Sequence, residues 1–187
     1  MIVAGIDYSL NGPAVAVFDT SKTFNYENVD IYYLTGTKKY VINDKTLQGD
    51  LLMEQPDNFH RYEYLKNWVY DKLEECEFVI IENYSYGSKG SSIFNLAEST
   101  GITKQKLWSK NIQVEVVPPK AIKKFYTGSG NASKSDMYKQ FKSETKIDLV
   151  TLFDYQKAEI VSPISDVCDS WAILKYGLDV YDFVNAL

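Results

Sequence analysis

Two apolar runs that each end in a carboxylate constrain the fold more than any other feature of the chain. Met1–Ile6 is followed directly by Asp7, and Phe78–Ile81 is followed directly by Glu82. Short, uninterrupted apolar runs are typical of strands buried inside a sheet. Burial penalises the charge of a carboxylate, so folding alone does not readily explain an acid at either position. We therefore expect two neighbouring strands whose ends bring these acids together.

A second pair of acids lies in an apolar helical segment near the C-terminus. Asp166 and Asp169 are three positions apart, which places both on one helix face. Four carboxylates brought together repel one another and resist desolvation, so such a cluster persists mainly when cations neutralise it. The sequence therefore predicts a divalent-metal site, and its all-oxygen ligands favour magnesium or manganese over zinc.

Two of these acids also have a purely structural explanation. Asp7 is followed by Ser9 and Asn11, so a carboxylate that stabilises a turn explains it about as well as a metal ligand does. Asp166 fits the negatively charged first turn of a helix. Glu82 is harder to explain in this way because glutamate is a weak turn former. The coincidence of all four acids favours the metal site.

Length and composition indicate one domain over residues 1–187. The 45% hydrophobic content suffices for one buried core, and the chain is too short for two ordinary domains. It shows no run long enough to span a membrane and no targeting segment, so we expect a cytoplasmic protein. Cys76 and Cys168 stand in predicted helices without metal or redox spacing and are expected to be reduced core thiols. The single histidine, His60, is expected to be structural or on the surface.

The charge of the chain is distributed unevenly. The net charge is −5, but the segment from Lys89 to Lys146 holds eleven lysines against four acids, which gives 11 − 4 = +7. The remainder therefore sums to −5 − 7 = −12. Such asymmetry is typical of a basic face beside an acidic remainder, although solvated helix surfaces explain it equally well.

The periodicity of apolar residues predicts an α/β fold with one mixed sheet flanked by helices. Strands are expected at 2–7, 14–18 and 29–34 as an antiparallel meander, and at 77–82 and 112–117. Helices are expected at about 59–73, 92–110, after Pro118, at 133–146 and at 164–182. Between residues 35 and 57 the apolar pattern fades, so we expect a long loop or irregular insertion there.

The four acids supply enough oxygens to bridge two cations about 4 Å apart, an arrangement that activates water for phosphodiester cleavage. Their motifs, in chain order, resemble those of the RuvC-type Holliday-junction resolvases. The matching segments are Gly5–Asp7, Val79–Glu82, Gly128–Lys134 and Asp166–Ile173. The similarity covers essentially the whole chain. It implies an RNase H-like fold with a five-stranded sheet, three strands antiparallel and the rest parallel.

The resemblance also implies roles for individual residues. Asp7, Glu82, Asp166 and Asp169 are expected to bind two Mg²⁺ ions, which Mn²⁺ can replace, and Lys134 is expected to lie near the scissile phosphate. The expected DNA contacts are Lys89, Lys120, Lys123, Lys124, Lys134, Tyr84 and Tyr86. A homodimer is expected, and its candidate interface residues on the 92–110 helix are Phe94, Ala97, Gly101 and Trp108.

The chain also departs from the family pattern. The loop after Asp7 is shorter, and the 35–57 segment is longer. Where the family places a loop aromatic that opens the junction, this chain has Ser85 between Tyr84 and Tyr86. Either tyrosine could stack on a base or cover the sheet edge. These departures suggest a divergent, bacteriophage-encoded member.

The expected function is that of a magnesium-dependent endonuclease, which binds four-way DNA junctions as a homodimer and makes paired symmetric nicks. The same chemistry on flaps, forks or RNA–DNA hybrids stays open, because carboxylates read metal and phosphate rather than branch shape. A non-catalytic branched-DNA-binding module is a third possibility. An actin-like or sugar-kinase ATPase also begins with a Gly-Ile-Asp strand, but it requires a duplicated domain for which this chain is too short.

Overall fold

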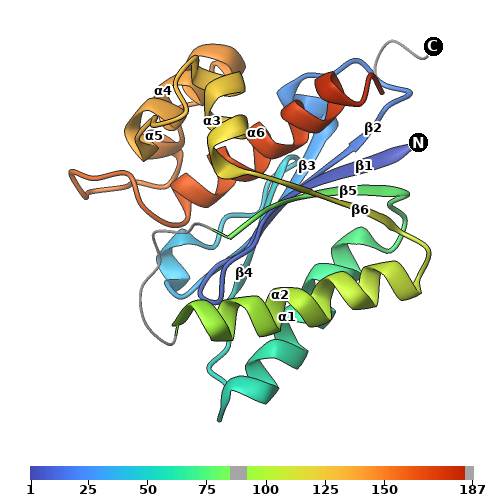
Figure 1. The fold of residues 1–187 in the computed structure, drawn as a ribbon. Coiled ribbons are helices and arrows are strands. Elements are labelled where there is room, and N and C mark those ends of the chain that lie inside the picture. The colour runs from blue at the N-terminus through green and yellow to red at the C-terminus, as the bar shows by residue number, and fades with distance from the viewer. Residues whose placement is uncertain (85–91, 184–187) are drawn as a thin grey trace.

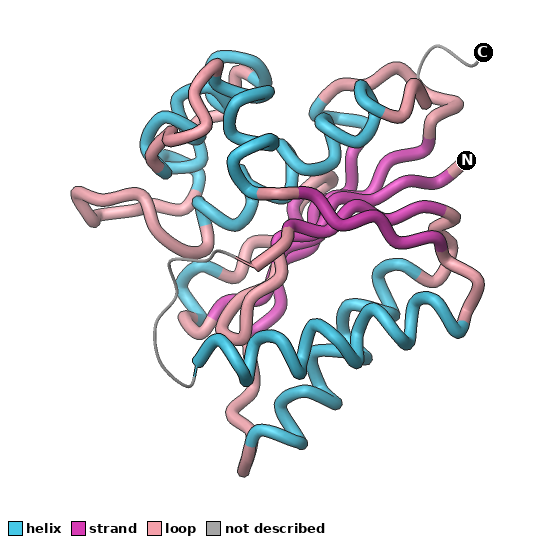
Figure 2. The backbone as a smooth tube through the Cα atoms, in the orientation of Figure 1, coloured by secondary structure: helices cyan, strands magenta, loops and turns pink. Residues whose placement is uncertain are grey.

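A mixed sheet divides the protein into two layers of helices (Figures 1 and 2). The computed structural model describes residues 1–84 and 92–183. Within them, six strands lie in the order β4-β3-β2-β1-β5-β6. Their bounds are β1 (Ile2–Asp7), β2 (Ala14–Asp19), β3 (Val29–Thr35), β4 (Leu47–Leu51), β5 (Phe78–Glu82) and β6 (Gln113–Val117).

The helices cover both faces of this sheet. They are α1 (Asn58–Leu73), α2 (Ser92–Ser109), α3 (Pro119–Thr127), α4 (Lys134–Thr145), α5 (Leu149–Leu152) and α6 (Ile164–Val180), with 3-10 turns η1 (Tyr26–Asn28) and η2 (Lys38–Tyr40). Figure 1 shows α1 and α2 on one face and α3 to α6 on the other. Among the described residues, no helix is both long and apolar enough to cross a bilayer.

The strand pairing confirms the predicted meander and the predicted neighbours. β1, β2 and β3 pair antiparallel in sequence order. β1 pairs parallel with β5, with Ile6 opposite Ile81, and β5 pairs parallel with β6. Asp7 and Glu82 each come directly after this matched pair, so the two acids end adjacent strands at the same edge of the sheet.

The prediction of five strands was wrong, because the segment expected to be a loop contains β4. β4 pairs parallel with β3, with Leu47 opposite Ile31. Its sequence, Leu-Gln-Gly-Asp-Leu, carries little apolar alternation. Distant partners stabilise it: the Trp68 indole donates a hydrogen bond to Asp50 Oδ2 over 2.9 Å. Local sequence could not reveal a strand that depends on such contacts.

The two cysteines are buried, free thiols, as expected. Cys76 lies after the end of α1 rather than in a helix, so that part of the prediction was wrong. Burial raises the pKa of Cys76 to about 12 and that of Cys168 well above its ordinary value. Both are therefore protonated and unreactive at neutral pH. His60 is exposed and hydrogen-bonds to Asp57 over 2.9 Å, in agreement with a surface role.

Side-chain alternation along β1 separates two apolar cores. Val3 packs in the core shared with α3, α4 and α6, whereas Ala4 and Ile6 pack in the core shared with α1 and α2. Trp171 of α6 is fully buried in the first core and packs against Phe141, with the ring centroids 5.8 Å apart. The central strands are therefore covered on both sides.

Two glycines set how closely α6 approaches the sheet. A Cβ added at Gly5 of β1 would lie 2.3 Å from the backbone nitrogen of Leu174. A Cβ added at Gly177 of α6 would lie 2.4 Å from Ile80 Cδ1. At Gly5 the close atoms belong to the α6 backbone, so only glycine allows α6 to lie directly against the β1 main chain, whereas at Gly177 the helix packs on the Ile80 side chain of β5. This packing brings the first turns of α6 to the strand ends that carry the acids.

Candidate active site

The acids at the strand ends point toward α6. Gly5 and Ile80 contact α6, and side chains two residues further along a strand point to the same face. Asp7 and Glu82 are those residues, and each ends its strand. The alternation therefore turns both carboxylates to the side of the sheet that α6 covers.

The two acids of α6 lie opposite these strand ends. Asp166 is in the first turn of α6, and Asp169 is one turn further along the same face. The turn between β1 and β2 also reaches this point, because a Cβ at Gly12 would lie 3.4 Å from Asp166 Oδ2. The charges of Asp169, Asp166 and Glu82 each raise the pKa of Asp7. The structure thus brings all four predicted acids together.

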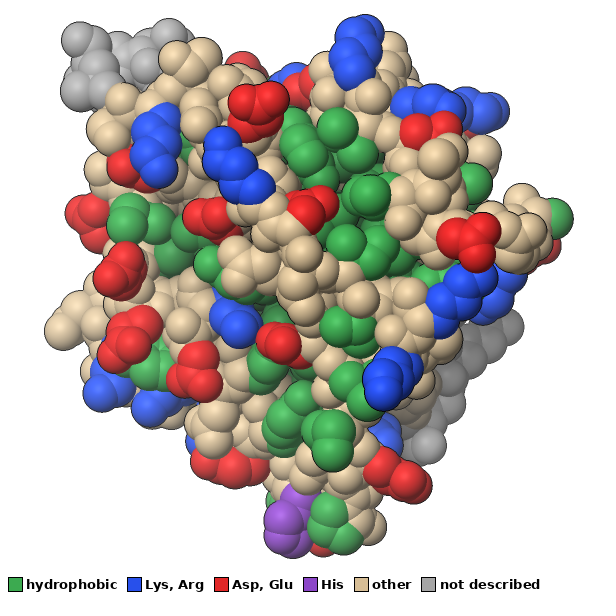
Figure 3. Space-filling view, turned by 180° about the vertical axis from the view of Figure 1, so that it is seen from behind, with side chains coloured by type: hydrophobic (Ala, Val, Ile, Leu, Met, Phe, Trp, Pro, Cys, Tyr) green, Lys and Arg blue, Asp and Glu red, His purple; other side chains and the backbone are tan. Residues whose placement is uncertain are grey.

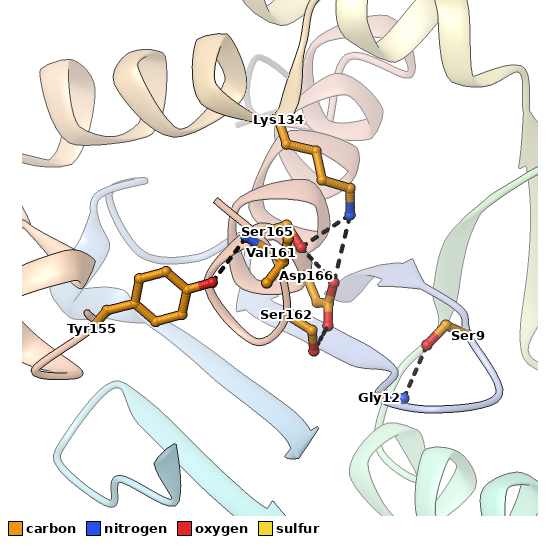
Figure 4. Close-up of polar contacts among 8 residues, drawn as sticks. All are labelled: Ser9, Gly12, Lys134, Tyr155, Val161, Ser162, Ser165 and Asp166. Carbon is orange, nitrogen blue, oxygen red and sulfur yellow. Dashed lines mark hydrogen bonds and ion pairs between the residues drawn. The ribbon is translucent and has the colours of Figure 1, made fainter. Parts of the chain in front are cut away.

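Asp166 is fixed by hydroxyl groups and by Lys134 (Figure 4). Ser162 Oγ donates to Asp166 Oδ2 over 2.5 Å, and Ser165 Oγ donates to Oδ1 over 2.8 Å. Lys134 Nζ donates to Ser165 Oγ over 3.0 Å and lies 4.0 Å from Asp166 Oδ1. Both carboxylate oxygens are thus hydrogen-bonded, and the residue is only 7% exposed.

Lys134 reaches the site because a capping box fixes the start of α4. Ser133 Oγ accepts from the Asp136 backbone N–H over 3.2 Å, and Asp136 Oδ2 accepts from the Ser133 N–H over 3.0 Å. A lysine in the first turn of a helix is unfavourable against the helix dipole. The four acids compensate for that cost, because their charges stabilise the ammonium group of Lys134.

The loop before α6 is ordered by Tyr155. Its hydroxyl donates to the Glu159 carbonyl over 3.1 Å. It also accepts from the Val161 N–H over 3.2 Å (Figure 4). These bonds fix the chain one residue before Ser162. Sequence reasoning missed Tyr155, Ser162 and Ser165. The serines flank Pro163 at the start of the predicted helix, a position where hydroxyls commonly cap, and this was the available signal.

The electrostatics of the site show an excess of negative charge. Burial raises the pKa of Asp7, and the three other acids raise it further against the opposing effect of Lys134. Burial also raises the pKa of Glu82 to about 7, with a contribution from Asp169. Burial raises the pKa of Asp169 to about 6, although Lys134 lowers it. Four acids thus face too little positive charge from the protein to stay ionised easily.

Two lysines offset part of this charge. Burial opposes the charge of Lys134, but the four acids outweigh burial and raise its pKa. Lys123 of α3 lies close enough to lower the pKa of Glu82 and of Asp169. Lys134 is therefore a permanent cation beside Asp166. Four carboxylates against two ammonium groups leave a net formal charge of −2.

This donor set fits Mg²⁺ or Mn²⁺ in its chemistry. All four side chains offer oxygen, and divalent cations would offset the charge that the protein leaves unbalanced. In the part of the chain that is described, no three His, Cys, Asp or Glu side chains already form a metal-binding arrangement. The acids are therefore close enough to shift one another's pKa without forming a ready-made coordination shell.

The expected DNA-contacting residues differ in their surroundings. Lys120 and Lys124 of α3 are exposed. Lys123 of the same helix is half-buried and close enough to Glu82 and Asp169 to lower their pKa values. Tyr84 is half-buried, and its hydroxyl donates to the Ala97 carbonyl of α2 over 3.4 Å. Tyr84 therefore packs on α2 and does not present a free ring. Lys89 and Tyr86 lie outside the described residues.

The lysine-rich segment does not form one continuous face. Its residues are divided between α2, on one side of the sheet, and α3 and α4, on the other (Figure 1). On the face turned away in Figure 1, basic and acidic side chains are interspersed (Figure 3). The charge asymmetry of the sequence is thus spread over both helix layers.

The outward face of α2 carries the expected interface residues. Phe94 is 70% exposed and Trp108 is 74% exposed. Ala97 and Gly101 are half-buried between them. Ile102, next to Gly101, is 39% exposed. Phe94 lies in the first turn of α2 and Trp108 in the last.

Known structures share this architecture. Thermus thermophilus RuvC matches with a TM-score of 0.63 and 14% sequence identity, and the match covers 97% of each chain. RuvC of the same organism in complex with a Holliday junction substrate gives a TM-score of 0.64 and 16% identity over 99% of this chain and 96% of that one. The yeast mitochondrial Holliday junction resolvase Ydc2 gives 0.56 and 14% over 98% and 81%.

Neither a scan against protein-family models nor a search of curated proteins gave a match. At identities of 14% to 16%, the structural matches establish the fold. The three matches cover 97% to 99% of this chain, so the similarity includes the sheet and both layers of helices. The chain therefore has the RuvC fold that the resemblance of its sequence motifs implied.

Proposed function

We propose that this protein is a magnesium-dependent endonuclease that resolves four-way DNA junctions by paired symmetric nicks. The observation that carries the proposal is the convergence of Asp7, Glu82, Asp166 and Asp169 at one edge of the sheet, with raised pKa values. Folding gains nothing from such a cluster, because each acid raises the cost of ionising another. The similar fold of RuvC in complex with its junction substrate supports the choice of DNA.

The four acids would hold the metal ions, with Asp166 as the member that the protein already orients. Bound Mg²⁺ would supply an activated water and stabilise the charge of the leaving oxygen. Lys134 places a permanent positive charge next to Asp166, where it can offset charge that develops on the scissile phosphate. Lys123 of α3, which lies close to Glu82 and Asp169, can also offset charge on the phosphate.

The DNA would approach the site across α3. Lys120 and Lys124 are exposed there, and Lys123 links this helix to the acids. Lysines read phosphate without sequence information, so these contacts would position the DNA rather than select bases. Tyr84 is committed to α2 by its hydrogen bond, which makes it a weaker candidate for base stacking than the sequence alone predicts.

Two copies of the chain would act together. Paired nicks require two active sites related by a two-fold axis. The exposed aromatic face of α2, with Phe94, Ala97, Gly101 and Trp108, offers the surface for a second copy. A cytoplasmic location and a bacteriophage origin stay predictions from the sequence.

Cleavage of defined substrates tests the function. Purified protein is incubated with a mobile four-way junction, a flap, a fork and an RNA–DNA hybrid in Mg²⁺, Mn²⁺, Ca²⁺ or EDTA. We expect symmetric nicks in the junction with Mg²⁺ or Mn²⁺ only, and binding without cleavage by Asp7→Asn. Preferential cutting of a flap, fork or hybrid would assign the same chemistry to that substrate. Cleavage that survives both Asp7→Asn and Asp169→Asn would refute this active site and favour a binding module.

Sedimentation tests the dimer. We expect wild-type protein to sediment as two copies and Trp108→Glu to sediment as one, since a buried charge opposes apolar packing. Phe59→Glu is the matched control, because Phe59 is 81% exposed on α1 outside the α2 face. A monomeric wild-type protein would contradict the proposed assembly.

A further inference from the structure

A buried cluster of three hydroxyl groups lies behind the candidate site, on the opposite side of the sheet from α6. Tyr8 directly follows Asp7, and its ring packs in the core of α1 and α2. Its hydroxyl lies 2.6 Å from Ser99 Oγ of α2 and accepts from Thr103 Oγ1 over 3.1 Å. Tyr8 is 8% exposed, and Ser99 and Thr103 are fully buried. We call these three residues the hydroxyl cluster.

The hydroxyl cluster is costly in an otherwise apolar layer. Leu107 and Ile6 pack nearby in the same core. Buried hydroxyls carry a desolvation cost that apolar side chains of similar shape avoid. A satisfied polar network in such a layer fixes relative position, because hydrogen bonds are directional and apolar contacts are not. The cluster therefore specifies where the end of β1 lies relative to α2.

The end of β5 has a tie to the same helix. Tyr84, two residues after Glu82, donates to the Ala97 carbonyl, and Lys104 Nζ lies 5.3 Å from the centre of its ring. Both strands that carry acids thus continue into a tyrosine that contacts α2. In contrast to Asp166, the carboxylates of Asp7 and Glu82 accept no hydrogen bond from the described residues. Their positions depend on the backbone that carries them.

We propose that the hydroxyl cluster positions Asp7 for metal binding, with Tyr8, Ser99 and Thr103 as positioning residues. The inference rests on the proposed function in that Asp7 is taken as a metal ligand. Consecutive Cα atoms are about 3.8 Å apart across a planar peptide, so fixing the Tyr8 ring restricts the Asp7 backbone. Loss of the Tyr8 hydroxyl frees this restraint without touching the carboxylate.

The test uses Tyr8→Phe with Tyr33→Phe as a matched control. Tyr33 is also fully buried, and its hydroxyl donates to the Tyr40 carbonyl over 2.9 Å and accepts from the Ile42 N–H over 3.0 Å. The readout is the Mg²⁺ concentration that gives half of the thermal stabilisation, measured without DNA. We expect Tyr8→Phe to raise it about tenfold, as for residues that orient metal ligands, and Tyr33→Phe to leave it unchanged.

Thr103 provides a second, independent variant. Thr103→Val keeps the shape but removes the hydroxyl, and Thr103→Ser restores it. We expect Thr103→Val to raise the Mg²⁺ midpoint, Thr103→Ser to stay near wild type, and Tyr8→Phe with Thr103→Val together to be little worse than Tyr8→Phe alone. In junction cleavage, the same variants should be rescued by high Mg²⁺ while junction binding in Ca²⁺ stays unchanged.

The outcomes separate this proposal from the proposed function. Unchanged Mg²⁺ midpoints in Tyr8→Phe and Thr103→Val would overturn the role of the hydroxyl cluster while leaving a cleaving enzyme intact. Equal shifts in Tyr8→Phe and Tyr33→Phe would overturn it too, because the effect would then be general destabilisation. If wild type binds Mg²⁺ but cuts no branched DNA, the proposed function is refuted. The Mg²⁺ midpoints of the variants still test the role of the hydroxyl cluster. If wild type is not stabilised by Mg²⁺, both proposals fail.

Discussion

The helix side and the strand side of the candidate site are built differently. On the helix side, Asp166 accepts hydrogen bonds from Ser162 and Ser165 and lies beside Lys134. On the strand side, Asp7 and Glu82 accept none from the described residues, and burial together with neighbouring acids raises their pKa values. The helix side is thus organised by the protein itself. The strand side has negative charge that is left for cations to balance.

Removing a carboxylate on each side gives the sharpest test of this difference. We expect Asp7→Asn to reduce cleavage by about a thousandfold, the scale of losing metal-ion stabilisation of the transition state. Without metal, Asp7→Asn should unfold at a higher temperature, by roughly 2–4 °C for about 1 kcal/mol of relieved repulsion. Asp166→Asn should also lose cleavage but unfold at a lower temperature, because an amide offers one acceptor oxygen where two serine hydroxyls donate. Calorimetry in EDTA checks this, and shifts of the same sign would break the comparison.

Lys134 should matter next most. We expect Lys134→Ala to lower the cleavage rate roughly a hundredfold, since it removes a fixed cation beside the reacting phosphate. Lys139→Ala is the control, because Lys139 is exposed on the same helix and only approaches Asp136 at 3.9 Å. Single-turnover cleavage at saturating Mg²⁺ measures the effect. Equal rates for the two variants would remove Lys134 from the site.

Both sides of the site should also show in the pH dependence of stability, through Glu82 on the strand side and Asp169 on the helix side. In the folded protein the pKa of Glu82 is about 7 and that of Asp169 about 6, whereas unfolded carboxyls titrate near about 4. The folded state therefore binds more protons in this window, and stability falls as pH rises through it. We expect the melting temperature in EDTA to fall between pH 5 and pH 8, and Mg²⁺ to reduce that fall. A melting temperature that rises with pH, or a fall that Mg²⁺ does not reduce, would contradict the assignment.

The smallest effect is expected on α3, outside both sides of the site. Lys124→Ala should weaken junction binding a few-fold and reduce the slope of log affinity against log salt by about 1. Lys22→Ala serves as the control, because Lys22 is exposed in the loop after β2. Binding in Ca²⁺ over a salt series measures both. An unchanged slope for Lys124→Ala would place the DNA elsewhere.

Sequence reasoning found the parts of the fold that have a local signature. Alternation and apolar runs identified β1, β2, β3, β5 and β6, with the β1-β2-β3 meander and the β1–β5 neighbours, and the capping box identified the start of α4. It missed β4, whose Leu-Gln-Gly-Asp-Leu sequence depends on partners such as Trp68. It also missed the short helix α5. Both elements are defined mainly by what packs against them.

The same division applies to the site. The four acids could be found because a carboxylate after an apolar run is anomalous by itself. The hydroxyls of Tyr8 and Thr103 could not, because tyrosine and threonine are unremarkable until a distant partner defines their role. Ser162 and Ser165 lie beside Asp166 in the chain, and their position at the helix start was a signal that was missed. Tyr84 is the opposite case: its loop position predicted a ring free to stack on a base, but its hydroxyl is bonded to α2.

The contact at Gly5 has a consequence for how the proposed enzyme would adapt to its ions. Because the α6 backbone rests on β1 without an intervening side chain, the span between Asp7 and Asp169 is set by two main chains. A methyl group at Gly5 would push α6 away from β1 and widen the gap that a pair of cations would bridge. The distance between the carboxylates that would hold the two ions therefore depends on Gly5, a residue that contributes no side chain to the site.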